Sequence, residues 1–446
     1  MKIFFIFVVS VLLLSAPSAK AEQYKMYNSL EDALKNPNDV RYLNLTDNNL
    51  IEFPKEILQF KNIERLHLYK NKLTSLPDEL ASLQKLMILD LNENRFTEIP
   101  EVLSQMENLT NLSLNNNYIK EIPNYIGNLK NLEMLDLEKN RVTTIGSGIA
   151  GLNSIKIIKL RNNQLTGLPA TFHNLQSLEM LEIGSNQEMN MEEAFQELLE
   201  LKSLMALDLS DMKIMFFPDK LGKLKKLAML DLSNNEIFAL PNTIKELENL
   251  TLLYLTNNPL KKLPESISVL RNLSMIDLTD VPLDSLPWNF GNLQQLASLT
   301  LSNNKLTDLP DSFVKLSSLS SLAITKNPQI DFSKTLKKLA KLPFLLDLIL
   351  TNNNIKEIPE ELAESKMLQS LFLEDNPSID LTQLFDVLSR SQTLKTLSLG
   401  SNGLTSLPEN VTKMSILEVL DLRNNKFSLP EQERIRAILP SVRLIW

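Results

Sequence analysis

Few side chains in this 446-residue sequence are of the types that perform covalent or metal chemistry. There is no cysteine, and histidine occurs only as His67 and His173. Without cysteine the chain has no disulfide, no thiolate zinc ligand and no cysteine nucleophile. Two isolated histidines leave little for a catalytic triad or a histidine metal site, and the sequence has no G-x-x-x-x-G-K-[ST] or G-x-G-x-x-G phosphate loop. We therefore expect no catalytic residues, no cofactor and no metal.

Carboxylates recur at a regular spacing in the middle of the chain. A column of residues 23 or 26 positions apart contains Asp136, Lys159, Glu182, Asp208, Asp231, Tyr254 and Asp277. The like charges in this column would repel one another mildly on adjacent strands. Two functional interpretations are open, a basic partner or a calcium ion between carboxylates. The structural alternative is a solvated acidic face.

A second column, two residues earlier, is apolar at seven consecutive positions. Its members are Met134, Ile157, Met180, Ala206, Met229, Leu252 and Met275. If they point to solvent from strands about 4.8 Å apart, they form a stripe of roughly 30 Å. Methionine adapts to partner surfaces, and contiguous exposed apolar area is uncommon on soluble proteins. The alternative is duplication of a Glu-Met-Leu-like phrase without a binding role.

The two columns together give the predicted partner-binding surface. Its residues are Met134, Ile157, Met180, Glu182, Asp208, Met229, Asp231, Leu252, Tyr254, Met275 and Asp277. A second predicted surface, the N-terminal cluster, consists of residue types that are frequent in binding hot spots. Its residues are Tyr42, Arg65, His67 and Tyr69. We interpret His67 as an exposed strand residue rather than a metal ligand.

A repeat that runs from end to end must position these residues. The phrase L-x-x-L-x-L-x-x-N-x-L-x-x-L-P places an asparagine column at residues 48, 71, 94, 117, 140, 163, 186, 212, 235, 258, 281, 304, 327, 353, 376, 402 and 425. The steps are 23 residues, except for three of 26. In Leu89-Asp90-Leu91 the period of two predicts a short strand with the leucines inward. The buried asparagine would satisfy backbone groups that water cannot reach.

These repeats predict one α/β solenoid. Each repeat buries its leucines only against its neighbours, so 17 strands should stack into a concave parallel sheet and bend into a horseshoe. The return side should be mostly extended or 3-10, with helices in the three 26-residue repeats. There, Asn190, Asp331 and Asp380 are expected helix N-caps. Met212 and Val281 interrupt the asparagine column.

The predicted organisation has four parts. Residues 1–21 read as a signal peptide: Lys2 precedes the apolar run Ile3–Leu14, and Ala19-Lys20-Ala21 is a cleavage motif. Residues 22–39 should form an N-terminal cap with a short helix opened by Ser29. Residues 40–430 hold the 17 repeats, and residues 431–446 form a C-terminal cap with a closing strand. The alternative for residues 1–21 is a membrane anchor. The mature chain has no second long apolar run.

The repeat columns are those of the leucine-rich repeat superfamily, in its 23-residue bacterial Leu-Pro form. The run from Asn28 to Leu45 and the C-terminal Leu-Pro ending are similar to those of leptospiral secreted leucine-rich repeat proteins. The resemblance implies a curved solenoid that binds macromolecules, usually proteins. For the leptospiral group it implies export and binding of host or matrix molecules. It implies no catalytic residues.

Other surface features leave further alternatives open. Met215, Phe216, Phe238 and Trp288 would form a self-association surface or pack locally. Two lysine groups are solvated faces or sites for sulfated glycans: Lys220, Lys223, Lys225 and Lys226, and Lys334, Lys337, Lys338 and Lys341. The net charge of −8 argues against nucleic acid.

The favoured function is an exported, non-enzymatic protein-binding protein, secreted or held at the cell surface or in the periplasm. It would be an interaction, adhesion or virulence-associated factor that engages a host or matrix protein through its concave face. One alternative is a self-associating structural protein of the cell envelope. The other is a repeat-type ubiquitin ligase effector, which would need a catalytic domain with a cysteine that this chain lacks.

Overall fold

The computed structural model describes residues 25–446. The predicted signal peptide, residues 1–21, and the cleavage after Ala21 lie outside the described residues. The chain divides into two compact units, Met1–Leu201 and Lys202–Trp446, which are described separately. No helix within residues 25–446 is both long enough and apolar enough to cross a membrane.

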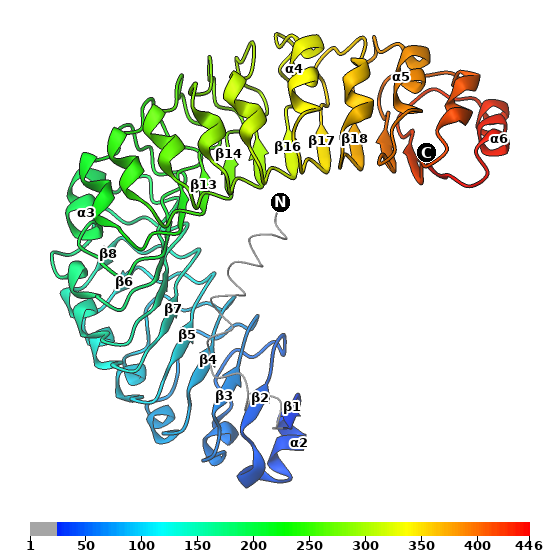
Figure 1. Cartoon of the computed structure of the whole chain (residues 1–446). Helices are drawn as coiled ribbons and strands as arrows, with labels where there is room; N and C mark the ends of the chain where they lie inside the picture. The colour runs from blue at the N-terminus through cyan, green and yellow to red at the C-terminus, as the bar shows by residue number, and fades with distance from the viewer. Residues whose placement is uncertain (1–24) are drawn as a thin grey trace. The chain divides into compact units, whose positions relative to one another are not determined.

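The first unit is built around a ladder of short parallel strands (Figure 1). Consecutive strands pair in register. The ladder consists of β1 (Met26–Tyr27), β2 (Tyr42–Asn44), β3 (Arg65–His67), β4 (Ile88–Asp90), β5 (Asn111–Ser113), β7 (Met134–Asp136), β9 (Ile157–Lys159) and β10 (Met180–Glu182). A second, two-stranded ladder pairs β6 (Glu121–Ile122) with β8 (Thr144–Ile145).

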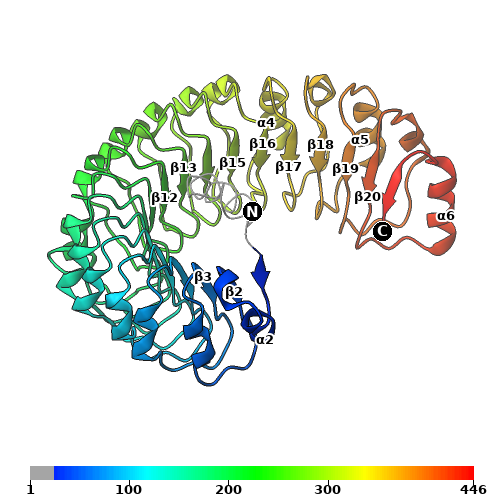
Figure 2. The ribbon, with the colours of Figure 1, turned by 90° about the horizontal axis from the view of Figure 1, so that it is seen from below.

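The second unit repeats this plan. Its parallel ladder consists of β11 (Ala206–Asp208), β12 (Met229–Asp231), β13 (Leu252–Tyr254), β14 (Met275–Asp277), β15 (Ser298–Thr300), β16 (Ser321–Ala323), β17 (Asp347–Ile349), β18 (Ser370–Phe372), β19 (Thr396–Ser398), β20 (Val419–Asp421) and β21 (Arg443–Ile445). The helices of this unit lie on the side away from the strands (Figure 2).

The leucines of each repeat form the core. In a strand such as Ile88–Asp90 the central Leu89 is fully buried, and so is Leu91, which follows the strand. The first and third residues of each strand point to the opposite side, as the period of two requires. We call the surface formed by these first and third positions the strand face, and the opposite surface of each unit the return face.

Buried asparagines join successive repeats. The Asn117 amide nitrogen donates to the carbonyl oxygens of Leu91 and Leu114, both at 3.0 Å. Its Oδ1 atom accepts the Phe96 N–H at 3.0 Å. The predicted role of the asparagine column is therefore confirmed, because one amide satisfies backbone groups in two repeats.

At the two interruptions of the column, the asparagine of the next repeat still supplies an amide donor. Beside Met212, Asn235 Nδ2 donates to the Leu209 carbonyl oxygen at 2.8 Å. Beside Val281, Asn304 Nδ2 donates to the Leu278 carbonyl oxygen at 3.0 Å.

The return face consists mainly of 3-10 turns that begin after the Leu-Pro pair, such as Asp78–Ser82 after Pro77. The three longer repeats form the α-helices that the sequence predicts: α3 (Met191–Leu198), α4 (Phe332–Leu339) and α5 (Leu381–Leu388). Their N-caps are the predicted Asn190, Asp331 and Asp380, whose side chains accept backbone N–H groups of the first turn.

A short helix and an edge strand lie near each end of residues 25–446. Ser29 caps α2 (Leu30–Leu34), and Ser428 caps α6 (Leu429–Ile438), in which Ile435 is fully buried. The caps contribute β1 and β21. They explain why residues 25–446 contain 19 ladder strands, two more than the 17 expected from the repeats alone.

Candidate binding surface

The apolar column of the first unit is only partly exposed. Ile157 pairs with Met134 on one side and with Met180 on the other. Met134 and Ile157 are half-buried, but Met180 is only 4% exposed. The predicted neighbours are therefore brought together, although the stripe offers less apolar surface than the sequence suggested.

The apolar column of the second unit is mostly buried, which corrects the prediction of an exposed stripe. Met229 and Leu252 are 6% and 5% exposed, Ala206 is 5% exposed, and only Met275 is half-buried. Outward side chains on strands about 4.8 Å apart touch their neighbours on both sides. Long side chains therefore cover one another along the ladder.

The aspartates of the acidic column have a structural role in the backbone. Asp136, Asp208, Asp231 and Asp277 are each the last residue of a strand. In each case Oδ1 accepts the N–H two residues later, at 2.8–3.0 Å. This local bond turns the chain out of the strand. Asp208 and Asp277 are also buried, at 4% and 1% exposed, so the row is not a solvated acidic face throughout.

The acidic column of the first unit contains its own cation. Lys159 pairs in register with Asp136 and Glu182, and its Nζ lies 3.9 Å from Glu182 Oε1. Burial raises the pKa of Asp136, while the Glu138 N–H and the Lys159 charge oppose that shift. Charges of both signs therefore alternate across these three strands.

The acidic column of the second unit has an aromatic residue at the corresponding position. Tyr254 pairs in register with Asp231 and Asp277. Burial raises the pKa of the Tyr254 phenol, and the two carboxylates raise it further. No group of three or more histidine or acidic side chains in residues 25–446 is arranged to hold a metal ion.

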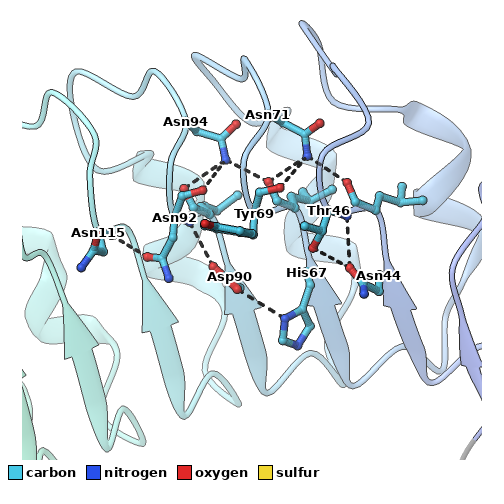
Figure 3. Close-up of polar contacts among 12 residues, drawn as sticks. Asn44, Thr46, His67, Tyr69, Asn71, Asp90, Asn92, Asn94 and Asn115 are labelled. Atoms are coloured by element: carbon cyan, nitrogen blue, oxygen red, sulfur yellow. Dashed lines mark hydrogen bonds and ion pairs between the residues drawn. The ribbon is translucent and has the colours of Figure 1, made fainter. Parts of the chain in front are cut away.

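The N-terminal cluster lies on strands β2 and β3 and just after β3, and all four of its residues are half-buried. The rings of Tyr42 and His67 are 5.0 Å apart, tilted at 41°. His67 Nδ1 lies 3.3 Å from Asp90 Oδ2, as Figure 3 shows. A hydrogen bond to the Glu93 carboxylate raises the pKa of Tyr69. The structure thus brings this predicted set together.

The supports of the cluster are residues that sequence reasoning did not single out. Asp90 orients His67 through one carboxylate oxygen, and its Oδ1 accepts the Asn92 N–H at 3.0 Å. Asn92 Oδ1 in turn accepts the Asn115 N–H at 2.6 Å. Figure 3 shows these residues along successive strand ends. Their position in the repeat could have identified them, because Asp90 is the in-register neighbour of His67.

The remaining surface candidates differ in character. Phe216 and Phe238 pack edge-to-face at 4.8 Å, yet they are 68% and 48% exposed. Trp288 is 70% exposed on the return face. In the α4 lysine group, Lys334, Lys337 and Lys338 all pair with carboxylates within 3.5 Å. These pairs reduce the positive field that a sulfated glycan would need.

The comparisons with known proteins agree with this architecture. The sequence profile of the leucine-rich repeat region matches residues 10–117, 109–213 and 252–371, which together make up more than half of the chain. The chain belongs to the leucine-rich repeat family. The leucine-rich repeat fold provides extended surfaces for binding other proteins.

Two solved leucine-rich repeat structures illustrate the likeness. A leucine-rich repeat protein of Leptospira interrogans is 32% identical, with a TM-score of 0.74; the alignment covers 95% of this chain and 100% of that chain. The functional domain of InlJ from Listeria monocytogenes is 18% identical, with a TM-score of 0.50, over 83% of this chain and 65% of that chain. At that identity the second likeness shows the fold alone. A comparison with curated proteins gives no match.

Proposed function

We propose that this leucine-rich repeat protein is exported and acts, without catalysis, by binding a protein outside the cell through its strand face. The partner class is a host extracellular or cell-surface protein. The N-terminal cluster is the observation that supports this most directly. It combines two tyrosines, an arginine and a histidine on adjacent strands, and aromatic and arginine side chains dominate binding hot spots.

The geometry of the cluster favours binding over chemistry. His67 is held between the Tyr42 ring and the Asp90 carboxylate. Such fixed side chains lose little conformational freedom when a partner binds. His173, the other histidine, contacts Glu197 Oε2 at 2.9 Å on the return face. Neither histidine adjoins a cysteine nucleophile, because the chain has none.

The test is affinity capture of extracellular and cell-surface proteins on the purified protein, followed by binding measurements with variants. Tyr42→Ala and His67→Ala should each lower the affinity for a captured partner by about tenfold or more, which is the effect expected when a hot-spot side chain is truncated. Glu101→Ala, on the return face of the same unit, serves as the control and should bind normally. A partner that binds all three variants equally well would contradict the proposed use of the strand face.

Self-association is a second candidate because one observation favours it. Met215, Phe216 and Phe238 are 50%, 68% and 48% exposed and adjoin in the second unit. Contiguous exposed apolar side chains are uncommon on monomers. Light scattering after size-exclusion chromatography distinguishes the two candidates. A dimer that Phe216→Ser converts to a monomer would support self-association, and a monomeric wild type would exclude it at that concentration.

A further inference from the structure

The strand face of the second unit contains a buried carboxylate oxygen without a donor. Asp277 is 1% exposed. Its Oδ1 accepts from the backbone N–H and the hydroxyl of Thr279, at 3.0 and 2.7 Å. Its Oδ2 is buried and has no hydrogen-bond partner among residues 25–446. Leaving a buried charged acceptor unsatisfied is costly, so a donor from a bound molecule that displaces the side chains covering this oxygen would be stabilised here.

The hydroxyl of the adjacent tyrosine faces only a weak hydrogen-bond acceptor. Tyr254 lies one strand away, in register with Asp277. Its hydroxyl points to Met275 Sδ at 3.7 Å, and a thioether sulfur is a weak acceptor. An aromatic face and an unsatisfied carboxylate oxygen therefore lie side by side on neighbouring strands.

The first unit contains a corresponding set of three side chains on neighbouring strands, in which the chain itself supplies the cation. Across β7, β9 and β10 the third strand positions are Asp136, Lys159 and Glu182, so a lysine lies between two acidic residues. Across β12, β13 and β14 the same positions are Asp231, Tyr254 and Asp277. The spacing and the flanking charges match, but the central cation is replaced by an aromatic ring.

We propose that the second unit binds an arginine side chain of the protein partner, between Asp231 and Asp277 and against the Tyr254 ring. This rests on the proposed function and names the chemistry that this part of the strand face recognises. A guanidinium stacks on an aromatic face and donates to carboxylates in a fixed planar fork. It would supply the donor that Asp277 Oδ2 lacks and the positive charge that Lys159 supplies in the first unit.

The Tyr254 environment supports this assignment. Burial and the two carboxylates raise its pKa, so the site combines a desolvated ring with a negative field. Arginine suits it better than lysine, because the ammonium ion is more strongly hydrated and has no planar face.

The direct test uses a fluorescent tri-arginine peptide, with tri-citrulline as its neutral isostere and tri-lysine as the second cation. Fluorescence anisotropy should show tri-arginine binding the full-length protein more tightly than either other peptide. Asp277→Asn should weaken tri-arginine binding by about tenfold, the size of a lost charge-assisted hydrogen bond. Asp347→Asn, which removes a charge from the same strand face, is the matched control and should stay within about twofold.

A second variant separates site occupancy from folding. Tyr254→Lys rebuilds the first unit's set of three side chains, so its own ammonium should fill the site and abolish tri-arginine binding. The melting temperature of this variant should be unchanged or higher. Reduced binding with an intact circular dichroism spectrum supports the proposal. Wild-type affinity in both Asp277→Asn and Tyr254→Lys would overturn it, as would equal binding of tri-citrulline or tri-lysine.

The outcome can be distinguished from failure of the proposed function. A captured partner that requires Tyr42 but binds Asp277→Asn and Tyr254→Lys normally would leave the proposed function standing and contradict the arginine site. A partner indifferent to all strand-face variants would contradict both.

Discussion

At the scale of single residues, the asparagine column links successive repeats through buried side-chain hydrogen bonds. Asn117 makes buried hydrogen bonds to Leu91, Leu114 and Phe96. Asn108, in the same repeat, donates one exposed bond to the Gln84 carbonyl at 2.8 Å. The same residue type therefore occupies two environments, and the buried one should dominate stability.

The first prediction compares these two asparagines. Asn117→Ala should lower the free energy of unfolding by about 3 kcal/mol, because several buried backbone groups lose their partner. Asn108→Ala should cost about 0.5 kcal/mol, because water replaces the lost bond. Urea unfolding followed by circular dichroism measures both. Equal effects of the two variants would contradict the structural role of the column.

Residue-scale burial is also where sequence reasoning failed. The period of two correctly placed Met180 and Met229 on the strand face, but their 4% and 6% exposure depends on neighbouring side chains. The sequence also did not reveal that the residue just before each column asparagine can adopt a left-handed backbone conformation. Lys139 and Glu93 do so, with φ of 53° and 50°, although such angles favour glycine.

At the scale of elements, two adjoining 3-10 turns on the return face of the first unit require glycine. These are η6 (Asn124–Asn128) and η7 (Ser147–Gly151). A Cβ atom at Gly148 would overlap the Asn124 carbonyl oxygen, and one at Gly127 would overlap the Gly148 carbonyl oxygen. Glycine therefore permits the close approach of two backbone segments.

The second prediction follows from this approach. Gly148→Ala should destabilise the protein by about 1–3 kcal/mol, since the backbone must move to admit the methyl group. Gly167→Ala is the control, because nothing lies within 4 Å of its Cβ position and its effect should stay within about 0.5 kcal/mol. Thermal unfolding by circular dichroism measures both. A neutral Gly148→Ala would show that the turns are not closely packed.

Elements were the scale at which the sequence was most informative. The repeat period placed each strand, and the three longer repeats placed α3, α4 and α5 with their N-caps at Asn190, Asp331 and Asp380. These features depend on local spacing and capping chemistry, which a sequence displays directly. The glycine contacts between η6 and η7 depend on how neighbouring repeats approach, so spacing alone could not reveal them.

At the scale of the whole molecule, the sequence predicts one solenoid, and the structure groups the chain into two compact units that divide after Leu201. The N-terminal cap belongs to one unit and the C-terminal cap to the other. A repeat stack needs a cap at each end, because an open end exposes its leucines to water.

The third prediction tests this dependence. Fragments 22–201 and 202–446, produced separately, should be less stable than the full chain or should aggregate, because each lacks one cap. Urea unfolding and light scattering of both fragments provide the measurement, with the full chain as the reference. Two monomeric fragments that each unfold cooperatively at the full-chain midpoint would instead establish two independent domains.

The claim that the strand face binds the partner is tested most directly by hydroxyl-radical footprinting of the complex with a captured partner. Aromatic and histidine side chains are readily oxidised, and both surfaces present them. We predict that the partner protects Tyr42 and His67 on the strand face and leaves Trp288, 70% exposed on the return face, unprotected. Protection of Trp288 with unchanged oxidation of Tyr42 and His67 would contradict the account.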